Sequence, residues 1–169
     1  NYISGSLLDQ GTINYNVADG TDDVDLEVSN SINRGGITKN GAGTLSLTST
    51  FNNLQTNTTT INAGVLELGG EGRLVNGNYS GAINNDGIFR HNSTNDQTLN
   101  GVISGTGAIE KNNTSTLTLT GANTYQGTTS VSNGTLALSA ADNNIASSVT
   151  IDVATGATLD VSGITNGFE

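Results

Sequence analysis

Large apolar residues and polar residues alternate in short runs along most of the chain. The clearest runs lie between residues 111 and 138, where Leu117 and Leu119 are separated by a threonine. The alternation continues in the two pairs that follow, Thr129 with Val131 and Leu136 with Leu138. A period of two predicts short strands with one buried face. Segments rich in Gly and Asn, at 121–127 and 133–134, separate these runs and predict turns.

The same unit occurs earlier in the chain, at residues 39–68, so the sequence contains an internal repeat. Its apolar residues align with those of the later copy: Leu45 with Leu117, Leu47 with Leu119, Ile61 with Val131, Leu66 with Leu136 and Leu68 with Leu138. The first copy is longer by about two residues between its first and second strands. A repeated unit of short strands and Gly/Asn turns predicts a stacked solenoid, in which each rung buries its inner face against its neighbours.

The irregular stretches between these units also correspond to one another. One predicted strand places Ile13, Tyr15 and Val17 on one face, and residues 24–28 alternate in the same way. Parts of residues 1–13 recur at 78–89, so the larger repeat is a block of roughly 75 residues, and a third block begins near Val149. We therefore predict a single solenoid over residues 1–169, with roughly seven or eight rungs and a length of about 35 Å.

Paired asparagines fall at the predicted turns. These pairs are Asn52–Asn53, Asn84–Asn85, Asn112–Asn113 and Asn143–Asn144. Stacked asparagine amides can form ladders along a rod of parallel strands. A solvent-facing turn position is the expected role for most of them.

Composition limits what the core and the surface can do. The 169 residues include no Pro, Cys, Met or Trp, and only 4% are aromatic, so the core must consist of Leu, Ile, Val, Ala and inward Thr. The formal net charge of −10 and the five basic residues argue against nucleic acid and anionic membranes as partners. Without an initiator Met or an apolar run that could span a bilayer, the chain is expected to be a piece of something longer.

Few residues offer catalytic or cofactor chemistry. His91 is the only histidine, which excludes a histidine-based triad or a multi-histidine metal site, and we expect it to have a structural or surface role. Glycine-rich segments are frequent, but none follows a strand and opens a helix, as phosphate binding requires. We therefore predict no catalytic residues and no cofactor.

Acidic residues are concentrated between residues 19 and 27. A strand here would carry Asp23, Asp25 and Glu27 on one face, and a solvated outer face is the expected interpretation. Asp19, Asp22 and Asp23 are also weak candidates for a Ca²⁺ site with turn carbonyls, because oxygen ligands suit a hard cation.

The two repeated segments, at about 37–68 and 109–138, resemble the passenger-associated transport repeat of bacterial autotransporters. The resemblance rests on residues 39–45 with 62–66 in the first copy, and on 116–129 with 133–136 in the second. The first copy departs from the pattern, because Phe51-Asn52-Asn53-Leu54-Gln55 stands where the second has Asn123-Thr124-Tyr125.

The resemblance implies a right-handed parallel β-helix within a passenger that is secreted by the type V route and displayed on a Gram-negative cell. It implies a structural or adhesive stalk, a virulence-associated adhesin that is not an enzyme. Its partners would be further copies of itself or a host or matrix surface, and its link to the outer membrane would be a C-terminal translocator barrel. In this family the repeat is also expected to aid secretion, because stacked rungs fold one after another.

Two other functions stay open. A polysaccharide-cleaving or polysaccharide-binding β-helix would need a groove lined by carboxylates, basic residues and aromatics, and the sequence shows no such cluster. A calcium-dependent binding module would depend on the acidic stretch around Asp22.

Overall fold

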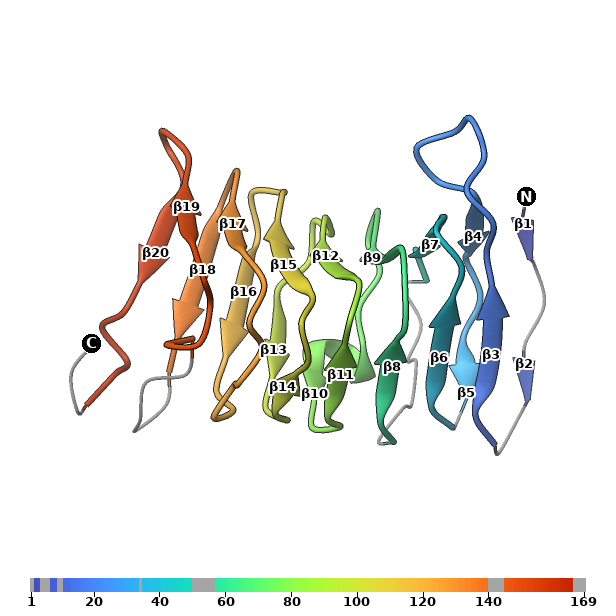
Figure 1. The fold of residues 1–169 in the computed structure, drawn as a ribbon, viewed down its shortest axis with the longest axis horizontal. Coiled ribbons are helices and arrows are strands. Elements are labelled where there is room, and N and C mark those ends of the chain that lie inside the picture. The colour runs from blue at the N-terminus through green and yellow to red at the C-terminus, as the bar shows by residue number, and fades with distance from the viewer. Residues whose placement is uncertain are drawn as a thin grey trace.

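The computed structural model describes residues 11–33, 35–49, 57–139 and 145–165, together with the backbone of 2–3 and 7–8. These residues form short strands joined by tight turns, and the single helical element among them is the 3-10 turn η1 (Val75–Gly77). No helix within these ranges has the length and apolar character needed to cross a membrane. Figure 1 shows the strands stacked into a rod whose first and last strands lie at opposite ends.

The strands form three long sheets and one short pair, and every strand pair is parallel. Sheet 1 contains β1 (Tyr2–Ile3), β4 (Leu26–Val28), β7 (Thr44–Leu47), β9 (Val65–Leu68), β12 (Ile88–His91), β15 (Ala108–Lys111), β17 (Thr129–Val131) and β19 (Ile151–Val153). Sheet 2 contains β3 (Ile13–Asn16), β6 (Ile37–Asn40), β8 (Thr59–Ile61), β11 (Ile83–Asn85) and β14 (Ile103–Ser104). Sheet 3 contains β10 (Asn78–Tyr79), β13 (Gln97–Leu99), β16 (Thr116–Leu119), β18 (Thr135–Leu138) and β20 (Thr158–Asp160), and the short pair is β2 (Leu7–Leu8) with β5 (Ile32–Asn33).

The chain visits the sheets in one cyclic order, and after β14 the described residues form no further strand in sheet 2. From β12 it passes through β13 in sheet 3 and β14 in sheet 2, and it returns to sheet 1 at β15. Nearer the N-terminus, β2 and β5 occupy the place of sheet 3 in this order. This path is that of a parallel β-solenoid, so the predicted all-β solenoid fold is confirmed. Its right-handed sense stays a prediction from the resemblance.

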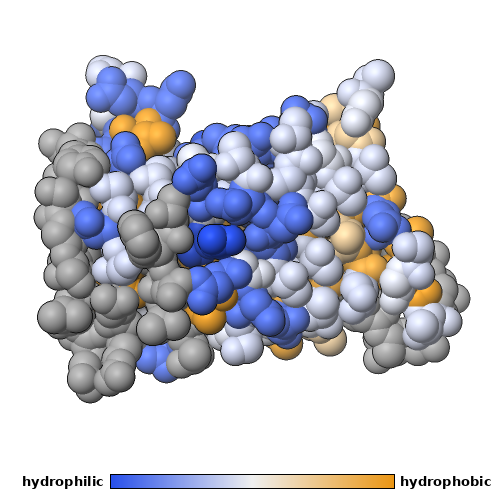
Figure 2. Space-filling view, turned by 180° about the vertical axis from the view of Figure 1, so that it is seen from behind, coloured by the Kyte–Doolittle hydropathy of each residue, from blue (hydrophilic) through white to orange (hydrophobic). Residues whose placement is uncertain are grey.

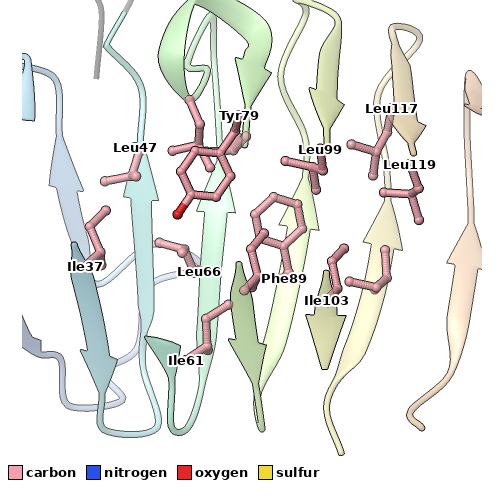
Figure 3. Close-up of a cluster of buried hydrophobic side chains, with 14 of the residues drawn as sticks. Ile37, Leu47, Ile61, Leu66, Tyr79, Phe89, Leu99, Ile103, Leu117 and Leu119 are labelled. Atoms are coloured by element: carbon pink, nitrogen blue, oxygen red, sulfur yellow. The ribbon is translucent and has the colours of Figure 1, made fainter. Parts of the chain in front are cut away.

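The core consists of inward side chains that stack on the same position of the next turn. In sheet 1 the register pairs Leu45 with Leu66, Leu66 with Phe89, and Phe89 with Ile109, and all four are fully buried. Figure 3 shows Leu66 and Phe89 directed into the interior between the sheets, together with apolar residues of the other two. Burial of each such side chain stabilises the fold by roughly 1.5–3 kcal/mol.

The predicted inner faces of the second copy are confirmed. In β16 and β18, Leu117, Leu119, Leu136 and Leu138 are buried, and the residues between them are partly exposed. The first copy differs, because all four residues of β7 and all four of β9 are buried, outward-facing ones included. The outer surface over these two strands therefore carries a second layer of contacts.

The two repeat copies lie on different sides of the solenoid. The first alternates between sheets 2 and 1 (β6, β7, β8, β9), and the second alternates between sheets 1 and 3 (β15, β16, β17, β18). The nine strands β1 to β9 correspond one to one to the nine strands β10 to β18. Each strand of the second series lies in the sheet that follows, along the path of the chain, the sheet of its counterpart in the first series. The long block thus comprises three turns plus one further side of the solenoid, and the strand–corner–strand unit of the repeat occurs on two different sides.

Candidate functional site

A row of charged side chains crosses the outer face of sheet 1. Glu67 on β9, Arg90 on β12 and Glu110 on β15 are paired in register on three successive turns. The Arg90 guanidinium donates through Nε to Glu110 Oε2 at 2.6 Å and through Nη1 to Glu67 Oε2 at 3.5 Å. One cation thus links carboxylates on both sides of it.

Further polar contacts bury the carboxylate of Glu67. Ser46 Oγ donates to Glu67 Oε1 at 2.9 Å, and Asn92 Nδ2 lies 3.4 Å from Glu67 Oε2. Glu67 and Ser46 are consequently 5% and 2% exposed, although both point away from the core. This hydrogen-bonded layer explains why β9 and β7 depart from simple alternation.

The acidic stretch forms a loop that projects from the rod between β3 and β4 (Figure 1). The carboxylate of Asp25 closes this loop where it joins the rod. Its two oxygens accept hydrogen bonds at 2.7 Å from the backbone N–H groups of Gly20 and Thr44. The strand begins only at Leu26. The expectation of an outer strand face carrying Asp23 and Asp25 is therefore wrong: the hydrogen bonds that Asp25 accepts from Gly20 and from the distant Thr44 keep this segment in a loop.

The calcium candidates lie on this loop. Asp19, Asp22 and Asp23 are exposed, and with Asp25, Arg90 and neighbouring residues they border an open groove of about 430 Å³ on the outer face of sheet 1. Among the described residues, no three or more His, Cys, Asp or Glu side chains converge as metal ligands would. The calcium site stays a prediction from the sequence alone.

The groove is polar but differs from the groove that a polysaccharide-cleaving β-helix needs. Its described lining supplies carboxylates and one arginine, a combination that the sequence did not reveal because Glu67, Arg90 and Asp22 come from separate turns. The lining includes no aromatic side chain among the described residues. The groove can hydrogen-bond a polar ligand, but it offers no ring on which a sugar could stack.

His91 lies inside the solenoid. It is fully buried, and sheet register places it between Leu68 and Lys111. Burial, reinforced by the charge of Lys111, lowers the pKa of His91 to about 4. His91 is therefore a neutral core residue at physiological pH.

Lysine residues are the buried charged groups that sequence reasoning missed. Lys39 and Lys111 are both fully buried, and burial lowers the pKa of Lys111 to about 8. They are the only lysines of the chain and stand at the same position of the two repeat copies. That coincidence was the available signal of a shared structural role.

Asparagine ladders are present, but mostly at positions other than the predicted pairs. Asn62 Nδ2 donates to Asn40 Oδ1 at 2.7 Å, and Asn100 makes the equivalent contact with Asn78. Of the predicted pairs, Asn84 accepts a hydrogen bond from Ser104 at 3.2 Å. Asn52, Asn53, Asn143 and Asn144 lie outside the described residues, as does the divergent loop 51–55.

Most of the surface is hydrophilic, as Figure 2 shows for the face opposite to that of Figure 1. Large hydrophobic residues that are exposed among the described ones gather mainly near β19 and β20: Val149, Val153 and Val161. The sides of the rod thus present Asn, Thr and Ser, whereas apolar surface is concentrated at one end.

Comparison with known proteins gives one match. The family model of the passenger-associated-transport-repeat matches the chain twice, at residues 37–68 and 109–138. These ranges coincide with the two repeat copies that contain the buried lysines. No curated protein and no solved structure matches the chain.

Proposed function

Since the chain carries two copies of the passenger-associated transport repeat, we propose that it forms a rigid stalk segment in the passenger of a bacterial autotransporter. The repeat implies secretion to the cell surface or the extracellular space. The observation that carries the proposal is the unbroken parallel ladder of sheet 1, which runs from β1 to β19. A continuous hydrogen-bonded ladder around an apolar core resists bending, as a stalk must.

The stalk also assists its own secretion in this proposal. Each turn pairs only with the turns before and after it, so the solenoid can form turn by turn as the chain emerges. A folded turn cannot slide back through a narrow translocator, so folding outside the membrane gives export a direction.

Adhesion is assigned to the outer faces. The inward positions hold nearly all the large apolar residues, so the outside offers hydrogen-bonding groups rather than an apolar pocket. We assign to these faces weak recognition of a host or matrix surface or of another copy of the rod, summed over many contacts. We propose no catalytic role, and the two carboxylates beside Arg90, those of Glu67 and Glu110, are both ion-paired to it.

The test is surface display of the full chain joined to a signal sequence and an outer-membrane translocator. Leu136→Asp places a charge in the core, and Ala137→Asp places the same charge on the outer side of the same strand. We expect Leu136→Asp to reduce the amount of passenger that external protease can reach, and Ala137→Asp to leave it unchanged. Equal display of both variants would contradict the role of folding in secretion.

The groove around Arg90 favours a second function, binding of a polysaccharide without cleavage. Arg90 and Asn112 border the groove beside the exposed carboxylates of Asp22 and Asp23, a combination suited to sugar hydroxyls. Titration with acidic and neutral oligosaccharides, followed by amide chemical shifts, tests this function. Shifts confined to the groove and abolished in Arg90→Leu would support it, and no shift at millimolar sugar would exclude it.

A further inference from the structure

The two lysines of the chain occupy equivalent positions in the two repeat copies. Lys39 lies in β6 and Lys111 lies in β15, each at or next to the end of its strand and each fully buried. β6 pairs with β8, and β15 pairs with β17, so each lysine stands one turn before the second half of its own repeat copy (Figure 1). A fully buried lysine is rare unless its ammonium group is paired.

The ammonium group of Lys39 joins two successive turns. It donates to the carbonyls of Asn40 and Gly41, at 3.0 and 2.8 Å, in the corner that follows its own strand. Its third donation, at 3.1 Å, goes to Ala63 O in the corner of the next turn. All three protons of the ammonium group therefore have an acceptor.

The ammonium group of Lys111 repeats this arrangement. It donates to Asn113 O in its own corner and to Asn133 O, at 3.3 Å, in the corner of the next turn. Asn113 and Asn133 align with Gly41 and Ala63 of the first copy. The same contact thus occurs twice, on two different sides of the solenoid.

The two corners approach so closely that only glycine fits between them. Gly64 has φ +66°, and a Cβ there would lie 2.6 Å from Gly41 O. Gly134 has φ +69°, and a Cβ there would lie 2.3 Å from Asn113 O. Carbonyl oxygens of successive turns are consequently crowded, and the buried ammonium group of each lysine donates to carbonyls of both corners.

We propose that Lys39 and Lys111 are inter-turn latches. Each ammonium group fastens the corner of the following turn onto its own corner, and without it that corner opens locally while the other turns stay folded. A latch in each repeat copy gives the growing solenoid two points at which a newly formed turn is held. The proposal goes beyond the stalk role, and because its test involves no secretion, either proposal can fail while the other stands.

Amide hydrogen exchange in Lys39→Met and Lys111→Met tests the latch. Methionine keeps an unbranched side chain but removes the donors. In Lys39→Met we expect exchange at the amides of Asn62 and Val65, which bond to the preceding turn, to accelerate roughly tenfold or more. In Lys111→Met the same acceleration is expected at the amides of Ser132 and Thr135.

Each variant is the control for the other. Lys39→Met should leave the amides of Ser132 and Thr135 unchanged, and Lys111→Met should leave those of Asn62 and Val65 unchanged. Uniform acceleration of all four amides in both variants would show a general loss of stability and would overturn the proposal. Unchanged exchange at the adjacent corner would overturn it as well.

A second measurement keeps the proposal testable if a variant does not fold. In the unaltered protein, an amine-reactive reagent reaches Lys111 only when its corner opens. We expect the protection of Lys111 from labelling, relative to Nα-acetyl-lysine, to equal the exchange protection of the Ser132 and Thr135 amides. Labelling of Lys111 at the rate of the free amino acid, with these amides still protected, would overturn the latch.

Discussion

The hydroxyl of Tyr79 lies 2.9 Å from Thr59 Oγ1, and this pair occupies the place that Tyr125 and Thr129 occupy in the second repeat copy. Thr59 and Thr129 align between the copies, but their tyrosines have different origins. Tyr125 comes from the loop four residues before Thr129, whereas Tyr79 comes from the next turn of the solenoid. The first copy has no tyrosine in its own loop, so a neighbouring turn supplies the missing hydroxyl.

Removal of either hydroxyl should therefore destabilise the fold. We expect Tyr125→Phe to lower the free energy of unfolding by about 1 kcal/mol. Tyr79→Phe should cost more, because the Tyr79 hydroxyl also donates to Asn57 O. Urea unfolding measures both changes.

Tyr15→Phe is the matched control. The Tyr15 hydroxyl is buried without a hydrogen-bond partner among the described residues, and burial raises its pKa to about 12. Its removal should leave stability unchanged or raise it slightly. A loss as large as that of Tyr125→Phe would contradict the hydrogen-bonded role of Tyr125.

A charge on the inner face of a strand should destabilise far more than the same charge on the outer face. Leu119 is fully buried in β16, and Thr118, its neighbour, is partly exposed. We expect Leu119→Asp to cost several kcal/mol, because a carboxylate in a thin apolar core has no partner. Thr118→Asp should stay within about 0.5 kcal/mol of the unaltered protein. Equal shifts of the melting temperature would show that the two faces are assigned wrongly.

The sequence was sufficient for the inner faces and insufficient for the outer contacts. Leu117 and Tyr15 could be placed inside because one face of a solenoid strand lies against the core and the other faces solvent. Apolar and polar residues therefore alternate along the strand, and this alternation is visible in the sequence. Asp25 could not be placed, because the hydrogen bonds of its carboxylate to distant amides, and not alternation, decide where β4 begins. Lys111 follows the apolar period, but a charged residue is assigned to solvent unless its acceptors are known.

The positions of the repeats around the coil were likewise not predictable. Alignment of Leu45 with Leu117 shows that the two residues belong to equivalent units, but it gives no information on which sheet each residue enters. Leu45 lies in sheet 1 and Leu117 lies in sheet 3. Which sheet Leu117 enters depends on how many strands and loops separate it from Leu45 along the chain.

Acid should destabilise the fold through His91. Because burial and the charge of Lys111 lower its pKa from 6.5 to about 4, the unfolded chain binds more protons than the folded protein between these two values. The free energy of unfolding should therefore fall as the pH is lowered from about 6.5 to 4, by up to roughly 3 kcal/mol from this residue.

His91→Leu isolates that contribution. Leucine matches the apolar neighbour Leu68 in the same row of sheet 1 and does not titrate. Chemical unfolding at intervals between pH 4 and 7 should give a shallower dependence on pH for the variant than for the unaltered protein. Identical curves would mean that His91 can be protonated without loss of the fold.

Self-association should occur through the outer face of sheet 2 and should strengthen with salt. One uncharged polar column runs along this face in register through Asn14, Thr38, Thr60, Asn84 and Ser104. A second rod can match its hydrogen-bonding groups to this column, and the weak contacts add along its length. The net charge of −10 opposes the approach of two copies, and salt screens that repulsion.

Sedimentation at low and high salt, over a range of protein concentrations, measures this association. We expect the dimer to become more populated as salt increases, and Thr60→Glu to weaken it. Thr118→Glu adds the same charge to the outer face of sheet 3, so it should weaken the dimer less. Tighter dimers at low salt would contradict the electrostatic argument, and equal effects of the two variants would contradict the choice of face. If the protein is a monomer under every condition, contacts between parallel rods are too weak to produce association. The stalk role would then be the only role proposed for this segment.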